Sequence, residues 1–377
     1  MPGIIYSNKY NLYNLGPAHP FSPLRTEMLI DLISELGYET NFKEPGQLAY
    51  QKLYEIHDPK YVYTVEELSK GKKLNDSNIY GLGTQDNPIT IGMAEGARYQ
   101  SSGTLLGAKL LIENKEKKIL NLGGGFHHAH KNFASGFCIY NDLALAIKEM
   151  IRHGWHVIYL DIDVHHGDGV QEMFYSDENI MTISIHESGE YLFPGSGWLH
   201  ELGKGMGRSL KLNLPLEPFT EGDSYLEVFD KTVTPALSWF KPDAIIIQTG
   251  VDAHFSDPLA DILLTTYDYE KLFKRIIELS DEYCKGRAIF TLGGGYSITA
   301  ATRIWAVLYF LLNNIPLPEN LPEKWRNKWS KKLNKNIPEL LHDKLPAYVE
   351  VPRKNIIEKT NRDLIQRLLD AVSSDWL

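Results

Sequence analysis

Short apolar runs rich in β-branched residues alternate along this chain with segments of helical spacing, and this alternation constrains the fold more than any other feature. The apolar runs cover residues 118–122, 157–160, 181–185, 244–248 and 288–292. The helical segments between them include residues 142–153, 224–240 and 267–283. Strands that alternate with helices form a mostly parallel sheet with helices on both faces. The pattern therefore predicts an α/β fold around such a central sheet.

The length of 377 residues would permit two domains. We nevertheless expect one domain over residues 1–377, because clusters of chemically reactive side chains are spread along most of the chain. Residues from about 315 to 377 are predicted to form a C-terminal extension, either packed on this domain or appended to it. Within it, residues 317–336 are rich in Pro, Trp and Lys, and six basic residues between Lys324 and Lys335 are expected to form a solvated face.

The formal net charge is −9, from 39 basic and 48 acidic residues. This balance argues against a nucleic-acid-binding surface and is compatible with cationic, lysine-bearing substrates. The two cysteines, Cys138 and Cys284, lie far apart without a pairing pattern, which indicates a reducing compartment. The N-terminal segment lacks the pattern of a signal peptide, and the longest apolar runs are too short to cross a bilayer. We therefore expect a cytoplasmic protein without membrane contact.

Acidic and imidazole side chains follow the apolar run at residues 157–160. Asp161, Asp163 and His165 alternate with apolar residues and so share one face. Two buried carboxylates are costly unless a cation neutralises them, so Asp163 and His165 are predicted to hold a divalent metal. Nitrogen and oxygen ligands suit zinc, with iron(II) as the competitor. A catalytic zinc needs a third protein ligand, and Asp252, which follows the run at residues 244–248, is the candidate.

Two glycine runs also follow predicted strands. The first precedes His127 and His128, and its spacing fits neither nucleotide-binding fingerprint. Histidines transfer protons near neutral pH, and Asp161 and Asp168 are available to orient them as two His–Asp pairs. The second run precedes Tyr296, which could donate its hydroxyl to an oxyanion or could be an ordinary core tyrosine.

In this order, the motifs resemble those of histone deacetylases, nearest to the class I-like and bacterial acetoin-utilisation branch. The resemblance covers roughly residues 10–307. The segments that carry it are 123–128, 135–138, 161–169, 193–195, 252, 254–260 and 292–296. It implies an arginase/deacetylase-like fold and zinc-dependent hydrolysis of the acetyl amide of acetyl-lysine side chains in peptides or proteins. Acetate would be released by a metal-activated water.

The resemblance implies a chemical role for each matching residue. His128 would be the general base and then acid, oriented by Asp168, while His127, paired with Asp161, would be its electrostatic partner. Tyr296 would polarise the acetyl carbonyl. The implied zinc ligands are Asp163, His165 and Asp252.

The resemblance also implies a substrate tunnel and monovalent cation sites. Phe137 and Phe193 would form the tunnel walls around the lysine stem, Leu259 would lie at its mouth, Asp86 would hold the substrate backbone, and Arg25 would line an inner acetate pocket. The residues implied in substrate binding are Asp86, Gly136, Phe137, Phe193, Leu259 and Arg25. A structural potassium is implied near Asp161, Asp163, His165, Ser184 and Ile185, and a second near Phe174.

Departures from the family pattern leave alternatives open. Phe126 stands where relatives often carry Trp, which indicates a differently shaped inner pocket, and Leu259 replaces the glutamate of polyamine-specific relatives. Leu259 favours acyl-lysine, and acetylated polyamines or other small acetylated amines are the alternative. An arginase-type hydrolase would need further metal-binding carboxylates where His166 and Gly167 stand. A catalytically inactive acetyl-lysine binder is the third alternative, although every proposed catalytic position is intact. The sequence makes no prediction of oligomeric state.

Overall fold

The computed structural model describes residues 2–38, 41–75 and 77–376. Seven strands form one sheet in the order β1-β2-β7-β6-β3-β4-β5, and every strand pairing among the described residues is parallel. The predicted α/β fold with a central parallel sheet is therefore confirmed. The strands are β1 (Gly3–Ile5), β2 (Lys118–Asn121), β3 (Val157–Asp161), β4 (Ile180–Glu187), β5 (Lys211–Leu216), β6 (Ala244–Gln248) and β7 (Ala288–Thr291).

The five strands predicted from apolar runs are present as β2, β3, β4, β6 and β7. Strands β1 and β5, at the two edges of the sheet, were not predicted. Strand β1 has only three residues, which is too short for a pattern. In β5, Lys211, Asn213 and Pro215 alternate with leucines, so no continuous apolar run marks this strand.

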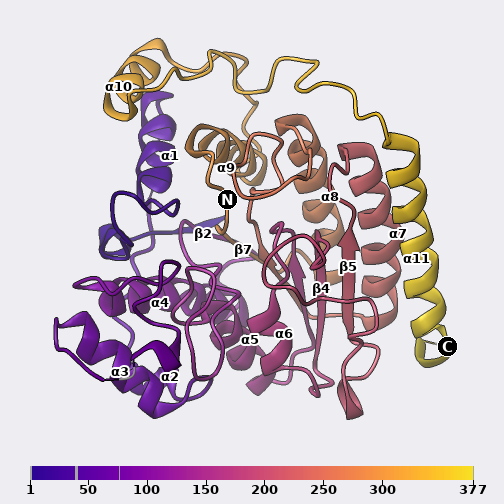
Figure 1. Cartoon of the computed structure of the whole chain (residues 1–377), viewed down its shortest axis with the longest axis horizontal. Coiled ribbons are helices and arrows are strands. Elements are labelled where there is room, and N and C mark those ends of the chain that lie inside the picture. Colours follow the sequence, from indigo (N-terminus) through magenta and orange to yellow (C-terminus); the bar gives the residue numbers. More distant parts are fainter. Residues whose placement is uncertain (1, 39–40, 76, 377) are drawn as a thin grey trace.

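Helices cover both faces of the sheet, as Figure 1 shows. One layer contains α4 and α5, which contact β2, β3, β6 and β7, with α3 against α4 and α6 against α5. The other layer contains α7, α8, α9 and α11, with α1 packed on α9 and α10 on α1. The helices are α1 (Leu24–Glu35), α2 (Tyr50–Leu53), α3 (Pro59–Ser69), α4 (Met93–Ile112), α5 (Asp142–Arg152), α6 (Asp168–Met173), α7 (Gly222–Phe240), α8 (Thr266–Cys284), α9 (Ile298–Leu312), α10 (Glu323–Leu333) and α11 (Lys354–Trp376).

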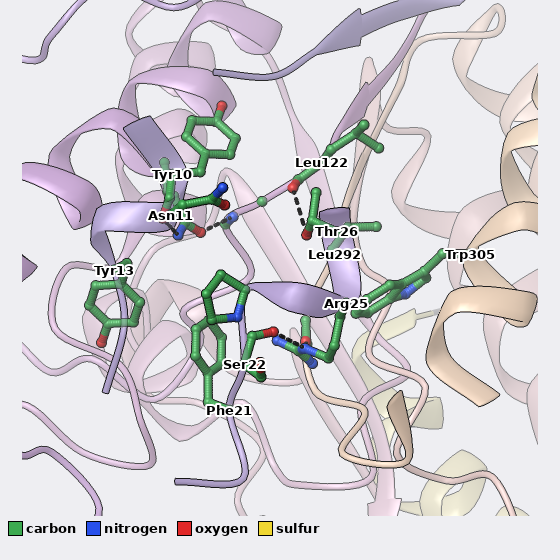
Figure 2. A pocket seen from close by; sticks show the side chains of 15 residues that line it. Tyr10, Asn11, Tyr13, Phe21, Ser22, Arg25, Thr26, Leu122, Leu292 and Trp305 are labelled. Atoms are coloured by element: carbon green, nitrogen blue, oxygen red, sulfur yellow. Dashed lines mark hydrogen bonds between the residues drawn. The ribbon is translucent and has the colours of Figure 1, made fainter. Parts of the chain in front are cut away.

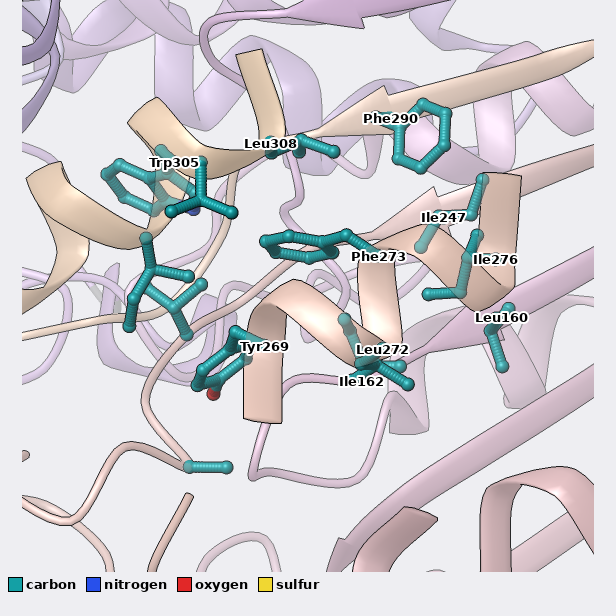
Figure 3. Packing of buried hydrophobic residues seen from close by; sticks show 14 of the residues in the cluster. Leu160, Ile162, Ile247, Tyr269, Leu272, Phe273, Ile276, Phe290, Trp305 and Leu308 are labelled. Atoms are coloured by element: carbon teal, nitrogen blue, oxygen red, sulfur yellow. The ribbon is translucent and has the colours of Figure 1, made fainter. Parts of the chain in front are cut away.

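The hydrophobic core is divided by the sheet into two parts. In β3, Ile158 and Leu160 belong to the cluster under α7, α8 and α9, whereas Val157 and Tyr159 belong to the cluster under α4 and α5. Figure 3 shows the first cluster, with aromatic side chains such as Phe273 of α8 packed against the strands. Because both faces of each central strand are buried, these strands need apolar residues at every position, which explains the unbroken runs.

The C-terminal extension packs along the rest of the chain. Helix α11 lies against α7 and β5, and α10 lies on α1 (Figure 1). Trp325 and Trp329 of α10 are buried, while Lys324, Lys328 and Lys332 are exposed and form ion pairs with acidic residues of α1. The basic face is therefore solvated, as expected, and it also holds α10 in place. One domain over residues 1–377 stays a prediction, which these contacts support.

One row of polar residues crosses the carboxyl ends of four neighbouring strands, β2, β7, β6 and β3, and continues into the middle of β4. The strand register aligns Asn121, Thr291, Gln248, Asp161 and Ser184. The loops that continue from β2, β7, β6 and β3 carry the glycine runs, the tandem histidines and the predicted metal ligands. This is the edge at which parallel α/β sheets bind their ligands. Within the described residues, no helix is both long and apolar enough to span a membrane.

Candidate metal and active site

Asp163, His165 and Asp252 meet at this edge of the sheet. Each offers one ligand atom, and these atoms all lie within 4.8 Å of one another. Nδ1 of His165 lies 3.0 Å from Oδ1 of Asp163 and 3.2 Å from Oδ2 of Asp252. All three side chains are buried. The structure thus brings together three residues that lie up to 89 positions apart in the chain.

The chain around these ligands fits a divalent cation. Oδ2 of Asp163 accepts hydrogen bonds from Gln248 Nε2 at 2.7 Å and Gly294 N at 2.9 Å. Oδ1 of Asp252 accepts one from Val164 N at 2.8 Å, but its buried Oδ2 has no well-aligned donor among the described residues. Burial and the neighbouring Asp163 carboxylate raise the pKa of Asp252 to about 7. An unpartnered carboxylate oxygen beside a second carboxylate and an imidazole is a donor set that a metal satisfies.

The glycine run after β7 lets the backbone approach both carboxylates. A Cβ atom at Gly294 would lie 1.9 Å from Oδ2 of Asp252 and 2.6 Å from Oδ2 of Asp163. No side chain fits there. Because the backbone comes this close, the amide of Gly294 can donate its hydrogen bond to Oδ2 of Asp163. This close approach explains why glycine is needed at this position.

The tandem histidines form two separate pairs with aspartates. Nδ1 of His127 lies 2.7 Å from Oδ2 of Asp161, and Nδ1 of His128 lies 2.7 Å from Oδ1 of Asp168. Burial and the neighbouring His127 lower the pKa of His128 to about 4, although Asp168 opposes this shift. Burial also acts to lower the pKa of His127, but the Asp161 and Asp163 carboxylates raise it to about 9. His127 is therefore charged and His128 neutral near pH 7.

A cavity of about 210 Å³ leads to this site from the surface. The Phe193 ring packs edge-on against His128 at 5.0 Å, and the Phe137 ring packs edge-on against Tyr296 at 5.5 Å. A Cβ atom at Gly136 would lie 2.4 Å from the His128 ring. Only glycine at this position therefore leaves room for the ring of His128. The residues that line this cavity are Asp86, His128, Gly136, Phe137, His165, Leu192, Phe193, Leu259 and Tyr296.

Tyr296 lines the same cavity from the loop between β7 and α9. Its backbone amide donates to Oδ2 of Asp257 at 2.6 Å, and the amide of Ser297 donates to the same oxygen at 3.2 Å. Burial raises the pKa of the Tyr296 hydroxyl well above its ordinary value. The hydroxyl therefore stays protonated near neutral pH and can act as a hydrogen-bond donor.

Comparison with known proteins identifies the family. The model of the histone deacetylase domain matches residues 19–311, more than half of the chain. The chain belongs to the histone deacetylase family. The resemblance inferred from the motifs is thereby confirmed.

Relatives of this deacetylase match it over nearly its whole length. The acetoin utilization protein AcuC of Bacillus subtilis (strain 168) is 36% identical and the match covers 98% of this chain and 97% of that protein. AcuC of Staphylococcus aureus (strain MRSA252) is also 36% identical, over 96% and 94%. The crystal structure of an HDAC homolog complexed with SAHA superposes with a TM-score of 0.87 at 26% identity, covering 97% and 99%. An HDAC homolog from Aquifex aeolicus gives 0.85 at 25% identity, over 96% and 99%. The predicted arginase/deacetylase-like fold is confirmed.

Arg25 of the deacetylase lines an inner pocket, which Figure 2 shows from close by. This pocket shares no lining residue with the entrance cavity. Its Nη1 donates to the carbonyl oxygens of Gly293 at 3.0 Å and Gly295 at 2.8 Å, so it holds the loop that carries Tyr296. The inner pocket measures about 30 Å³, and a small cavity that borders His127 and Asp163 shares lining residues with both the inner pocket and the entrance. A series of cavities thus runs from the surface past the site to Arg25.

Several residues of the deacetylase site were given no role from the sequence, although Asp257 lies in one of the motifs that carry the resemblance. Gln248 holds Asp163, Asp257 holds the backbone of Tyr296, and Leu192 lines the entrance. The signal for Gln248 was its place as the last residue of a predicted strand. Leu192 has no comparable signal, because it lies in a loop next to Phe193.

The residues implied in potassium binding lie beside the candidate metal ligands Asp163, His165 and Asp252. Strand pairing places Asp161 opposite Ser184, with Ile185 next along β4, and Ser184 Oγ lies 2.9 Å from Nδ1 of His186. A potassium ion at this place stays a prediction.

Proposed function

We propose that this protein hydrolyses the acetyl amide of acetyl-lysine side chains in peptides or proteins, using one zinc ion held by Asp163, His165 and Asp252. The observation that carries the proposal is the buried ligand group facing His128 and Tyr296 at the base of a narrow cavity. Two buried carboxylates and an imidazole match the three-ligand sites of catalytic zinc, and iron(II) is the alternative metal.

Side chains of the protein carry out the proton transfers of this reaction. When bound, the metal provides Lewis-acid polarisation of the acetyl carbonyl and acidifies a water molecule. His128 is neutral near pH 7, because burial keeps its pKa low, so it accepts the proton of the attacking water. Asp168 fixes its ring through Nδ1. The Tyr296 hydroxyl donates to the oxyanion that develops on the former carbonyl. His128 then returns the proton to the leaving amine.

In this proposal, the entrance cavity and the inner pocket bind different parts of the substrate. The Phe137 and Phe193 rings flank a narrow passage whose shape suits an unbranched methylene stem, with Leu259 and Asp86 at its lining. We propose that acetate occupies the inner pocket, where Arg25 supplies a positive charge. Phe126 is buried and lines the small cavity that borders His127. The size of the Phe126 side chain therefore affects the width of the connection between the entrance and the inner pocket.

Two observations favour this function over its alternatives. Leu259 at the entrance offers no carboxylate to a polyamine, which carries additional ammonium groups. Among the described residues, the ligand group contains one carboxylate pair and one imidazole, which supports one metal rather than the two of an arginase-type site. Deacetylation of acetylated polyamines is the second candidate. A cytoplasmic location stays a prediction.

Kinetics on an acetyl-lysine peptide and on acetylspermidine, with metal content measured in the same preparation, test the proposal. We expect about one zinc per chain and a higher kcat/KM for the peptide. Leu259→Glu should shift this ratio toward acetylspermidine, and Leu259→Met, which preserves the apolar character, should leave it unchanged. A strong preference of the wild type for acetylspermidine would overturn the substrate, and two metals per chain would overturn the mechanism.

A further inference from the structure

Lys211 of β5 is a fully buried lysine far from the entrance cavity. Its relative exposure is 0%, and it forms no ion pair with any described acidic residue. Nζ donates to the carbonyl oxygen of Ile180 at 2.7 Å and lies 3.4 Å from that of Asp177. Both oxygens belong to the chain that leads from α6 into β4. The ammonium is thus held by backbone carbonyls.

Such an environment is unusual for a lysine and usual for a monovalent cation. A buried ammonium is costly, and carboxylates normally offset this cost. The Asp177 carboxylate forms no ion pair with Lys211, and its Oδ1 instead accepts hydrogen bonds from the backbone and side-chain nitrogens of Asn179, both at 2.9 Å. Backbone carbonyl oxygens that replace a hydration shell are, by contrast, the ligands that potassium takes in proteins.

We propose that the Lys211 ammonium is a built-in cation that replaces a bound potassium ion in the loop from Phe174 to Ile180. The family resemblance implies a second potassium near Phe174, but the residues present do not fit one, because the Lys211 ammonium already donates to the carbonyl oxygen of Ile180 and lies beside that of Asp177.

The consequence is a loop whose structure does not depend on the potassium concentration. The loop follows α6 directly, and the first residue of α6 is Asp168, which orients His128. Lys211 therefore supports the helix that carries this aspartate without an exchangeable ion. Burial lowers the pKa of Lys211 to about 7, and Asp177 opposes this shift, so the ammonium form is best examined at a pH below 7.

Crystals grown with rubidium in place of potassium test the proposal directly through the anomalous signal of rubidium. In the wild type, we expect no rubidium within bonding distance of the carbonyls of Asp177 and Ile180. In Lys211→Ala, which empties the space of the ammonium, a rubidium ion should appear between these two oxygens. Rubidium in this loop of the wild type would overturn the proposal, and this measurement does not require that any variant fold.

Thermal unfolding gives an independent readout in solution. Lys211→Ala should unfold at a lower temperature than the wild type in choline chloride, and potassium or ammonium chloride should restore part of the loss. Lys211→Met fills the space with an apolar chain and should be destabilised without such restoration. Lys204→Ala removes an exposed lysine nearby and serves as the matched control. Equal potassium responses of Lys211→Ala and the wild type would contradict the proposal, whatever the deacetylase assays show.

Discussion

Nδ1 of His128 lies 2.7 Å from Oδ1 of Asp168, and this contact fixes the tautomer and the direction of the histidine ring. With Nδ1 occupied by the carboxylate, the proton-accepting nitrogen is Nε2, and the ring borders the entrance cavity. The neighbouring His127 uses the same atom for Asp161 at 2.7 Å. Two adjacent histidines are thus oriented by two separate aspartates.

Replacement of His128 by alanine should reduce kcat by about 10²- to 10⁴-fold with a small change in KM, because the proton acceptor is lost while the entrance stays intact. Asp168→Asn should also reduce kcat, since an amide can favour the wrong tautomer. Steady-state kinetics on an acetyl-lysine peptide measure both effects. His153→Ala, at an exposed histidine, is the control. A His128→Ala enzyme with wild-type kcat would contradict the assigned role.

His130 shares Asp168 with His128 and should give the protein a specific pH dependence. Its Nε2 lies 3.3 Å from Oδ2 of Asp168, and its Nδ1 contacts Glu172. Burial opposes protonation, but Asp168 and Glu172 raise the pKa of His130 to about 9. A raised histidine pKa stabilises the folded state fully below the unfolded pKa of about 6.5, and this contribution is lost as the pH rises through 9.

The free energy of unfolding of the wild type should therefore fall between about pH 6.5 and 9 more steeply than that of His130→Gln. Chemical denaturation across this range measures the difference. Glu172→Gln removes one of the two carboxylates that face the ring and should reduce the slope in part. Parallel curves for the wild type and His130→Gln would show that His130 does not carry the charge inferred here.

Tyr296→Phe should lower kcat by about 10²- to 10³-fold, the effect typical of removing one oxyanion donor, with little change in KM. The aromatic ring, which packs against Phe137, is retained in this variant. Tyr269→Phe is a matched control, because this buried tyrosine of α8 has no hydrogen-bond partner for its hydroxyl among the described residues. Unchanged kcat in Tyr296→Phe would remove the tyrosine from the mechanism.

The sequence predicted those parts of the fold and site that depend on short-range pattern. The central strands read as apolar runs because both of their faces are buried, and the histidines and ligands follow them directly. The position of Asp252 beside His165 required the strand order, in which β6 pairs with β3. Edge strand β5 and the contact of Lys211 with Ile180 could not be predicted, since they depend on how a loop closes over the sheet.

Asp343, in the C-terminal extension, connects this segment to the site. Its Oδ2 accepts from His254 Nε2 at 3.0 Å and from the backbone of Thr266 at 2.8 Å, and its Oδ1 accepts from Arg303 Nη2 at 2.9 Å. His254 is two residues from Asp252. Burial acts to raise the pKa of Asp343, but His254 and Arg303 hold it well below its usual range.

Asp343→Ala should cost about 3–5 kcal/mol of unfolding free energy, because it leaves the buried Arg303 without its partner. Lys324→Ala, which breaks an exposed ion pair of the same extension, should cost less than about 1 kcal/mol. A depressed carboxyl pKa stabilises the fold above the unfolded pKa of about 4, and this contribution is lost as the pH falls further. The acid side of the wild-type stability curve should therefore be steeper than that of Asp343→Asn. Equal losses in the Asp343→Ala and Lys324→Ala variants would mean that Asp343 does not fasten the extension to the His254 loop.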